Sequence, residues 1–578
     1  MIFTDGLIVL GQYAVTLLVF FVSVLGWGLW CIRPFTPQVS PARSLALALG
    51  IGIVALSLLG LATAFVARFW QAFWKPASLV IVALALLGLL LFGWEQRWVL
   101  RSQAGKILTG GLVFLALLVV RLIFIRSILL PPYHDSAEHY MLVQSLLRPL
   151  EMGDVANFLL DASARYYHLG FHALAAWWVS ATGLEVAPAL ALLGQVFLVI
   201  CPFTVFALAD SLNGEQGFAW FAALLAAIGW SMPAFAVNWG KYPALAAVAG
   251  FPAVVTLWWF SRGGRGRVFG RYALLLILSA GLTMLHSRAL VLLALAACGV
   301  GFAWIRFPER MPLGWSLLPA CVILPVFYWL REPLLSRYFG LGDITLLLVI
   351  LGLPFAFSFS PRLSAVMGLF MLGIYAASVT KLPAMLRGYS RFLLDRPFVD
   401  MSLFLPLSAL VGLELAGLLF RLSSKPRLQA GLKAFFAGMI LISFSLQGSL
   451  RADRCCNYVE TGDLYAMNWI KSETAPDAIV LVSGYEMSNY QVATDGGAWV
   501  RALTGRNVNK VRYDLPWDAA SARALVCKPE WNEPYIYAGG QEFSFDRNRL
   551  YRPEWYEVVC EFEGTRVYKV HNCKDNNP

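Results

Sequence analysis

The sequence has few charged residues. Asp, Glu, Lys and Arg together make up 14% of its 578 residues, whereas hydrophobic residues make up 59% and the mean hydropathy is +0.66. A soluble globular chain carries roughly 25% charged residues, so this chain has too little polar surface to fold in water. The same figures exclude a disordered chain, a collagen and a small disulfide scaffold. A polytopic membrane protein is the class that remains.

The sequence also lacks any nucleic-acid-binding motif, and we expect no cleavable leader in its first apolar stretch. Its net charge of +11 comes mainly from Lys and Arg in short loops between apolar stretches, where basic residues set membrane orientation. We therefore expect no nucleic-acid partner. The first apolar stretch has neither a basic start nor a small-residue cleavage site, which predicts a retained helix.

Long apolar windows recur along the chain and predict about 14 membrane crossings, since a spanning helix needs about 20 apolar residues. The predicted crossings are 6–30, 45–66, 76–94, 107–130, 188–209, 217–234, 243–261, 272–288, 290–305, 313–330, 343–359, 364–380, 399–420 and 430–447. Residues 451–578 contain no such window, so we expect them to form a soluble domain.

The positions of the basic loops predict the orientation. The loop 262–271 carries Arg262, Arg265, Arg267 and Arg271 without an acid, so we expect it on the cytoplasmic side. The loop 131–187 and the C-terminal domain then lie on the extracytoplasmic side of the plasma (inner) membrane. The basic loop 381–398 falls on the extracytoplasmic side in this topology, against the rule that basic loops are cytoplasmic. Either the number of crossings before it is wrong, or this loop binds an anionic group.

Five of the nine cysteines fall in the C-terminal domain: Cys455, Cys456, Cys527, Cys560 and Cys573. Disulfides persist on an extracytoplasmic face. Because five is odd, at most two internal bridges form and one thiol remains. The pairing stays open.

A polar segment follows the fourth predicted crossing. In Pro-Pro-Tyr-His-Asp-Ser-Ala-Glu-His-Tyr (131–140) the two prolines end the preceding helix. Asp135 or Ser136 is expected to cap a new helix, and the spacing places Asp135 and Glu138 on one face. When the motif is taken alone, a plain N-cap followed by a stabilising acid explains it fully and is the favoured interpretation.

Histidines gather around this segment. Four of the six lie within 131–175, and His286 lies near the outer end of a crossing. His168 and His172 are expected to share a face of a short helix that reaches about Thr182. We expect this helix to lie at the outer interface, with Trp177 and Trp178 as anchors.

Further basic groups fall at the same predicted level as Asp135 and Glu138. Each one alone is explained by contact with lipid headgroups. Together they predict a cationic surround for an anionic lipid-linked group. These residues are Lys241, His286, Arg288, Arg337 and Arg391.

An Asp-x-x-Glu motif that opens the first long outer loop, followed by the aromatic and histidine-rich stretch from Tyr167 to His172, resembles the GT-C superfamily of membrane glycosyltransferases. The resemblance implies N-terminal transmembrane helices (1–106), a catalytic transmembrane module (107–450) with the outer loop 131–187, and an extracytoplasmic α/β domain (451–578). It also implies a sugar donor on a polyprenyl phosphate and a carboxylate of this loop at the reacting centre.

Transfer of a hexosyl or pentosyl group from a lipid phosphate needs a base and a stabilised leaving group. Asp135 is the predicted base, oriented by Glu138 or His139, and a single displacement inverts the anomeric centre. The predicted donor-binding residues are His139, His168, His172, Lys241, His286, Arg288, Arg337 and Arg391. No cofactor is required, although Asp135, Glu138 and His139 are an alternative Mg²⁺ or Mn²⁺ set. The expected partners are the polyprenyl-linked donor, membrane lipid and a glycan, lipid or protein acceptor.

The pattern of helix and strand signals in the C-terminal domain predicts a small α/β fold. Asp463 is expected to cap a helix, and strands are expected near 478–482, 556–562 and 565–570. Asp495, Trp499 and Arg506 are candidates for covering the site or contacting the acceptor. Turn chemistry and core packing explain the same residues without a ligand.

Two other classes of function remain as alternatives. A transporter or lipid flippase would be expected to carry repeated halves and ionisable groups near the bilayer midplane. A non-catalytic cell-envelope assembly protein would leave the clustered histidines and carboxylates unexplained.

Overall fold

The computed structural model describes residues 2–67, 69–148, 168–213, 216–261, 268–302, 307–338, 343–382, 391–447, 449–487, 490–528, 531, 534–571 and 573. It contains two compact units. The helical unit comprises residues 1–124, 143–237 and 241–450, and the C-terminal unit comprises 125–142, 238–240 and 451–578. Residues 1–106 thus belong to the same unit as most of 107–450, whereas the start of the polar segment is grouped with the C-terminal domain.

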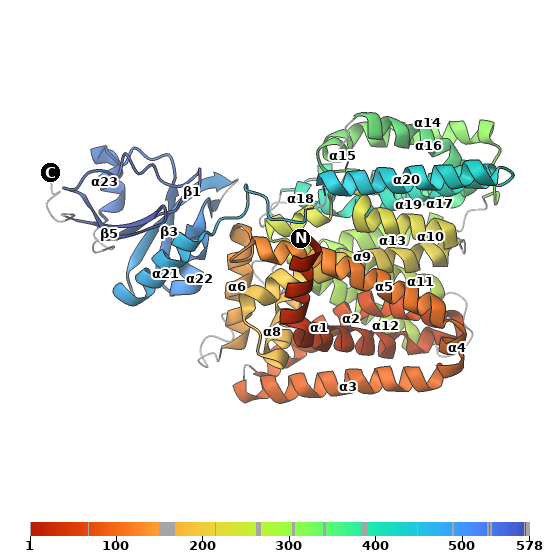
Figure 1. The fold of residues 1–578 in the computed structure, drawn as a ribbon, viewed down its shortest axis with the longest axis horizontal. Helices are drawn as coiled ribbons and strands as arrows, with labels where there is room; N and C mark the ends of the chain where they lie inside the picture. Colours follow the sequence, from red (N-terminus) through yellow and green to blue (C-terminus); the bar gives the residue numbers. More distant parts are fainter. Residues whose placement is uncertain are drawn as a thin grey trace. The chain divides into compact units, whose positions relative to one another are not determined.

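The helical unit is built from packed apolar helices (Figure 1). Their bounds are α1 (Ile2–Ile32), α2 (Pro41–Ala67), α3 (Trp74–Glu95), α4 (Arg97–Ser102), α5 (Ala104–Leu122), α8 (Gly170–Thr182), α9 (Val186–Asn213), α10 (Gln216–Leu224), α11 (Tyr242–Phe260), α12 (Val268–Leu285), α13 (Ala289–Phe302), α14 (Leu313–Trp329), α15 (Arg331–Arg337), α16 (Asp343–Phe359), α17 (Pro361–Val379), α18 (Arg396–Ser402), α19 (Phe404–Arg421) and α20 (Pro426–Gln447). Helix α6 (Tyr133–Leu147) begins in the C-terminal unit.

The apolar helices identify a multi-pass membrane protein. Among the described residues, nine helices are long and apolar enough to span a bilayer, or ten if α14 and α15, which are bent by 72° at their junction, form one span. Each predicted window falls on an apolar helix. Four of these helices, at 217–229, 269–285, 289–302 and 346–359, are shorter than a full span, so the predicted count of about 14 is not confirmed. Arg262, Arg265 and Arg267 lie outside the described residues.

Helix α1 packs closely against α2 and α3 because glycine residues of α1 lie at both contacts. A Cβ atom on Gly28 of α1 would lie 2.1 Å from the carbonyl oxygen of Ala48 in α2. A Cβ atom on Gly26 would lie 2.0 Å from the carbonyl oxygen of Ala85 in α3. Small residues at such contacts let backbones approach within van der Waals distance, which is how helices associate in lipid.

Helix α8 differs from its prediction. It packs against α2, α3 and α9 inside the helical unit, and both Trp177 and Trp178 are 0% exposed. The Trp178 indole Nε1 donates to the carbonyl oxygen of Thr16 (3.0 Å). The prediction of interfacial anchors is therefore wrong. His168 precedes the helix, so the expected face shared with His172 is not formed either.

The C-terminal unit is built around a six-stranded mixed sheet (Figure 1). Its strands are β1 (Ile479–Met487), β2 (Tyr490–Ala493), β3 (Asn507–Arg512), β4 (Tyr535–Ala538), β5 (Tyr556–Phe562) and β6 (Thr565–Val570), with helices α21 (Thr461–Glu473), α22 (Val500–Thr504) and α23 (Ala520–Val526). Strand β1 pairs in parallel with β3 and β4, and β6 joins β4 to β5 through antiparallel pairs. The small α/β domain with additional strands is confirmed.

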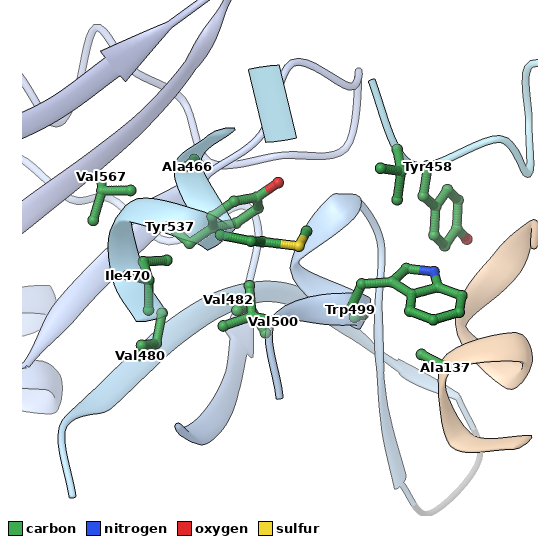
Figure 2. Close-up of a cluster of buried hydrophobic side chains, with 13 residues drawn as sticks. Ala137, Tyr458, Ala466, Ile470, Val480, Val482, Trp499, Val500, Tyr537 and Val567 are labelled. Carbon is green, nitrogen blue, oxygen red and sulfur yellow. The ribbon is translucent and has the colours of Figure 1, made fainter. Parts of the chain in front are cut away.

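Residues that alternate along β1 face two separate cores. Val480 and Val482 lie in one core with Ile470 of α21, whereas Leu481 lies in the other with Trp517. This alternation follows from the period of two in a strand. Figure 2 shows the first core, in which Trp499 lies beside Ala137 of α6. Helix α6 thus begins as part of this domain's hydrophobic core.

Local contacts complete the C-terminal unit. Glu460, not Asp463, is the N-cap of α21, and Asp463 completes a capping box as its third residue. Disulfides join Cys527 to Cys573 and Cys455 to Cys456, and Cys560 is free. Two bridges and one remaining thiol match the number that the odd cysteine count allows.

The close α1–α2 contact generates a stability prediction. Gly28→Ala should destabilise the protein by about 1–3 kcal/mol, because the added methyl group overpacks against Ala48. The control is Gly11→Ala in the same helix, where a Cβ atom would have no neighbour within 4 Å. It should be neutral or stabilising by up to about 1 kcal/mol. Unfolding in detergent measures both, and equal effects of the two variants would contradict this packing.

Candidate functional site

The polar segment enters α6 through a defined backbone geometry. Tyr133 is the first residue of α6 and has a φ of 68°, a left-handed conformation that is unusual for a non-glycine residue. Its N–H donates to the carbonyl oxygen of Cys456 (2.8 Å), and the Ser136 hydroxyl donates to the carbonyl oxygen of Pro132. The helix starts earlier than expected, so Asp135 lies in its first turn rather than at its N-cap.

Asp135 forms a pair with the histidine that precedes it. His134 Nε2 lies 3.0 Å from Asp135 Oδ1, and the side chains are 10% and 23% exposed. A carboxylate oxygen only accepts hydrogen bonds, so Nε2–H is the donor. The His134 ring lies 4.1 Å from the Tyr133 ring. Asp135 is therefore a partly exposed carboxylate with a buried histidine at hydrogen-bonding distance.

His134 was not among the residues predicted from the sequence for this site. The available clue was its position directly before Asp135, in a segment that already placed four histidines close together. Helical spacing favours partners three or four residues apart, so it selected Glu138 and His139 instead.

Glu138 and His139 take different positions on α6. Glu138 is exposed and lies 3.9 Å from Lys510 Nζ of β3, a loose ion pair. His139 is buried, at 5% exposure. Glu138 therefore lies next to a cation of the C-terminal domain, whereas His139 packs inside the unit.

Aromatic side chains surround the first turn of α6. The Tyr133 ring lies 5.6 Å from the Tyr458 ring, and the Tyr140 ring lies 5.5 Å from the Trp499 ring. Burial raises the pKa of Tyr458, and the nearby Tyr133, Tyr485, Asp495 and Asp135 raise this pKa further. Tyr458 is therefore a neutral phenol beside the Asp135 carboxylate.

Asp495, Trp499 and Arg506, the residues predicted to cover the site or contact the acceptor, make structural contacts. Asp495 is 0% exposed and accepts hydrogen bonds from the Gly497 and Gly539 N–H groups and the Ser544 hydroxyl. Trp499 is fully buried. The Arg506 guanidinium donates to the carbonyl oxygens of Lys471 and Thr474 at the end of α21.

The basic and histidine residues predicted to bind the donor, apart from His139, lie in the helical unit, and three of them meet there. The ring centroids of His168 and His286 are 4.3 Å apart, and His286 also stacks on Phe398 of α18 (4.8 Å). Arg288 Nη2 lies 3.1 Å from Asp395 Oδ2, the carboxylate that caps α18. This polar cluster, defined by His168, His286, Arg288 and Asp395, contacts the start of α18 through Asp395 and His286.

The remaining predicted cations are more dispersed. His172 is fully buried and contacts Phe171, which in turn stacks against Tyr242, the residue after Lys241. The Arg337 guanidinium lies over the Phe235 ring (4.8 Å). Arg391 is exposed before α18. The aromatic stretch that carried part of the resemblance begins at Tyr167, outside the described residues.

Among the residues that the structure describes, no group of three or more His, Cys, Asp or Glu side chains is arranged to hold a metal ion. No protein-family model matches the sequence, and a comparison with curated proteins gives no match.

The buried Asp495 generates a pH prediction. Burial raises the pKa of Asp495 to about 6 from an ordinary value of 3.8. The folded state therefore binds this proton more tightly than the unfolded state, so stability is lost as the pH rises through about 6. From about pH 4 to about pH 7, the free energy of unfolding should fall by about 2 kcal/mol relative to Asp495→Asn, whose side chain does not ionise.

Asp514→Asn is the control for this measurement. A hydrogen bond from Arg512 lowers the pKa of the exposed Asp514, so this carboxylate should favour folding as the pH rises. From about pH 4 to about pH 7, Asp514→Asn should keep the wild-type pH dependence in unfolding followed by tryptophan fluorescence, because both the ordinary and the lowered pKa of Asp514 lie below this range. The same pH dependence in wild type and Asp495→Asn would show that Asp495 does not titrate in this range.

Proposed function

We propose that this protein is a membrane glycosyltransferase that moves a hexose or pentose from a polyprenyl-phosphate-type lipid to an extracytoplasmic glycan, lipid or protein acceptor. One observation carries the proposal: Asp135, in a chain of apolar helices, presents a partly exposed carboxylate that has a buried histidine 3.0 Å from one of its oxygens. Ionisable groups are rare in membrane chains and are retained where they have a function.

Asp135 acts as the general base in this proposal. His134 donates to Oδ1, and the partly exposed carboxylate of Asp135 accepts the proton of the acceptor hydroxyl as the hydroxyl oxygen attacks the anomeric carbon. General-base help of this kind contributes roughly 10²–10⁴-fold. Because the acceptor displaces the lipid phosphate in a single step without a covalent intermediate, the anomeric centre inverts.

The leaving phosphate gains negative charge during the transfer, and a fixed cation in a low-dielectric site stabilises that charge. Arg288 is the leading candidate, with His286 and His168 beside it. Its present partner is the Asp395 carboxylate at 3.1 Å. A phosphate would bind Arg288 in place of that carboxylate, because guanidinium recognises both anions with the same geometry. Lys510 lies next to Glu138, which supports a role for Glu138 in orienting the acceptor.

The first test of the proposal removes the base. Asp135→Asn should lower kcat by about 10²–10⁴-fold and leave the donor KM nearly unchanged, because the amide cannot accept the proton. Transfer is measured in membranes with labelled polyprenyl-phosphate hexose and pentose as donors. Cells that carry only this variant should accumulate a glycosylated polyprenol, detected by mass spectrometry of lipid extracts.

The control is Asp518→Asn, which changes an exposed carboxylate in the C-terminal unit and should leave transfer intact at equal protein abundance. Full transfer by Asp135→Asn, or unchanged lipids in cells lacking the protein, would reject a glycosyltransferase with this base. Unchanged lipids would favour the transporter and assembly alternatives.

The second test concerns His134. Replacement by Leu removes the hydrogen bond to Asp135 Oδ1 and should lower kcat by about 10–100-fold, the effect of losing a hydrogen bond to a charged group. Gln retains an N–H donor and should restore part of the rate. An unchanged kcat in His134→Leu, or a loss in both variants without recovery in Gln, would show that the histidine does not act through this hydrogen bond.

A further inference from the structure

A cavity of about 140 Å³ lies within the helical unit, between α9, α10, α11, α13, α17 and α19. Its wall is apolar and includes Phe218, Phe251, Val255, Met367, Phe370 and Leu405. A cavity of similar size lined by apolar residues stays dry and accepts an apolar molecule of about six carbon atoms. This space therefore suits a segment of hydrocarbon chain and not a hydrated ligand.

Small residues create this space. Ala296 and Gly299 of α13 and Ala409 of α19 line the cavity, and Ala296 and Ala409 are nearly buried, at 8% and 9% exposure. Larger aliphatic side chains would close the space and recover the packing energy that an empty cavity forfeits. The unfilled volume is thus available to an occupant from the surrounding lipid.

Among the described residues that line the cavity, Arg362 is the only ionisable one. It is exposed, and its guanidinium carbon lies 5.9 Å from the centre of the Trp259 ring. Ser360 also lines this end of the cavity, and its hydroxyl makes no capping hydrogen bond to α17. A single cation and a hydroxyl group therefore adjoin an apolar cavity.

We propose that this cavity binds an anionic glycerophospholipid of the membrane. A segment of one acyl chain enters the apolar space, and the phosphodiester pairs with Arg362 and Ser360. One guanidinium balances the single negative charge of a phosphodiester, whereas an isoprenyl phosphate monoester carries up to two charges and would leave one unbalanced. The proposal uses no residue of the Asp135 or Arg288 sites and does not depend on the proposed function.

The test measures the lipid retained by the full-length protein. The protein is reconstituted in nanodiscs of about equimolar phosphatidylglycerol and phosphatidylethanolamine, released in the gas phase and analysed by native mass spectrometry. Wild type should retain phosphatidylglycerol. Arg362→Gln should retain about fivefold less, the effect expected when one basic residue at a membrane surface no longer attracts an anionic lipid. Ala296→Leu should show a similar loss because it fills the cavity.

Matched variants separate this site from general lipid contact. Arg427→Gln changes an exposed arginine that also follows a proline at the start of a helix, α20. Ala297→Leu enlarges the exposed neighbour of Ala296 on α13. Both controls should retain phosphatidylglycerol as wild type does. Retention of phosphatidylglycerol at the wild-type level by Arg362→Gln and Ala296→Leu would overturn the proposal. Preferred retention of phosphatidylethanolamine, or of isoprenyl phosphate in nanodiscs that contain it, would overturn it as well.

Discussion

A charge that leaves water needs a partner, and this requirement explains the polar contacts inside the helical unit. Arg43 pairs with Asp210 between helices α2 and α9, and the buried Arg121 donates to the carbonyl oxygen of Ala227 (3.0 Å). The same cost makes Asp135 informative. Its carboxylate lies 3.0 Å from Nε2 of the buried His134 and is 23% exposed, so a partner is present here as well.

The sequence predicts those parts of the fold that depend on local pattern. Continuous apolar windows locate the helices, and the runs at 556–562 and 565–570 coincide with β5 and β6. The burial of a side chain, by contrast, depends on contacts with segments that are distant in the sequence. Trp177 and Trp178 have the composition of interfacial anchors, yet the small residues of α8 let the whole helix pack within the helical unit. Four apolar windows form helices too short for the 20-residue length on which the crossing count depended.

The candidate site could be predicted only where its residues are neighbours in the chain. Asp135 and Glu138 follow from a motif, whereas the Asp395 partner of Arg288 and the Lys510 partner of Glu138 come from distant segments. Sequence alone also could not separate ligand contacts from structural ones. Arg506 resembles a binding residue in a turn, but its guanidinium satisfies carbonyl groups that α21 leaves unpaired at its end.

The hydrogen bond from Tyr133 to Cys456 has a consequence for the order in which the protein is made. The ribosome completes the His134–Asp135 pair long before it reaches the turn at Cys456, whose carbonyl oxygen accepts this hydrogen bond. Until that turn emerges, the start of α6 lacks an acceptor for the Tyr133 N–H, and the aromatic ring of Tyr458 is also missing. A nascent chain that ends before this turn would therefore have all its early helices, while the contacts that hold the first residues of α6 would still be missing.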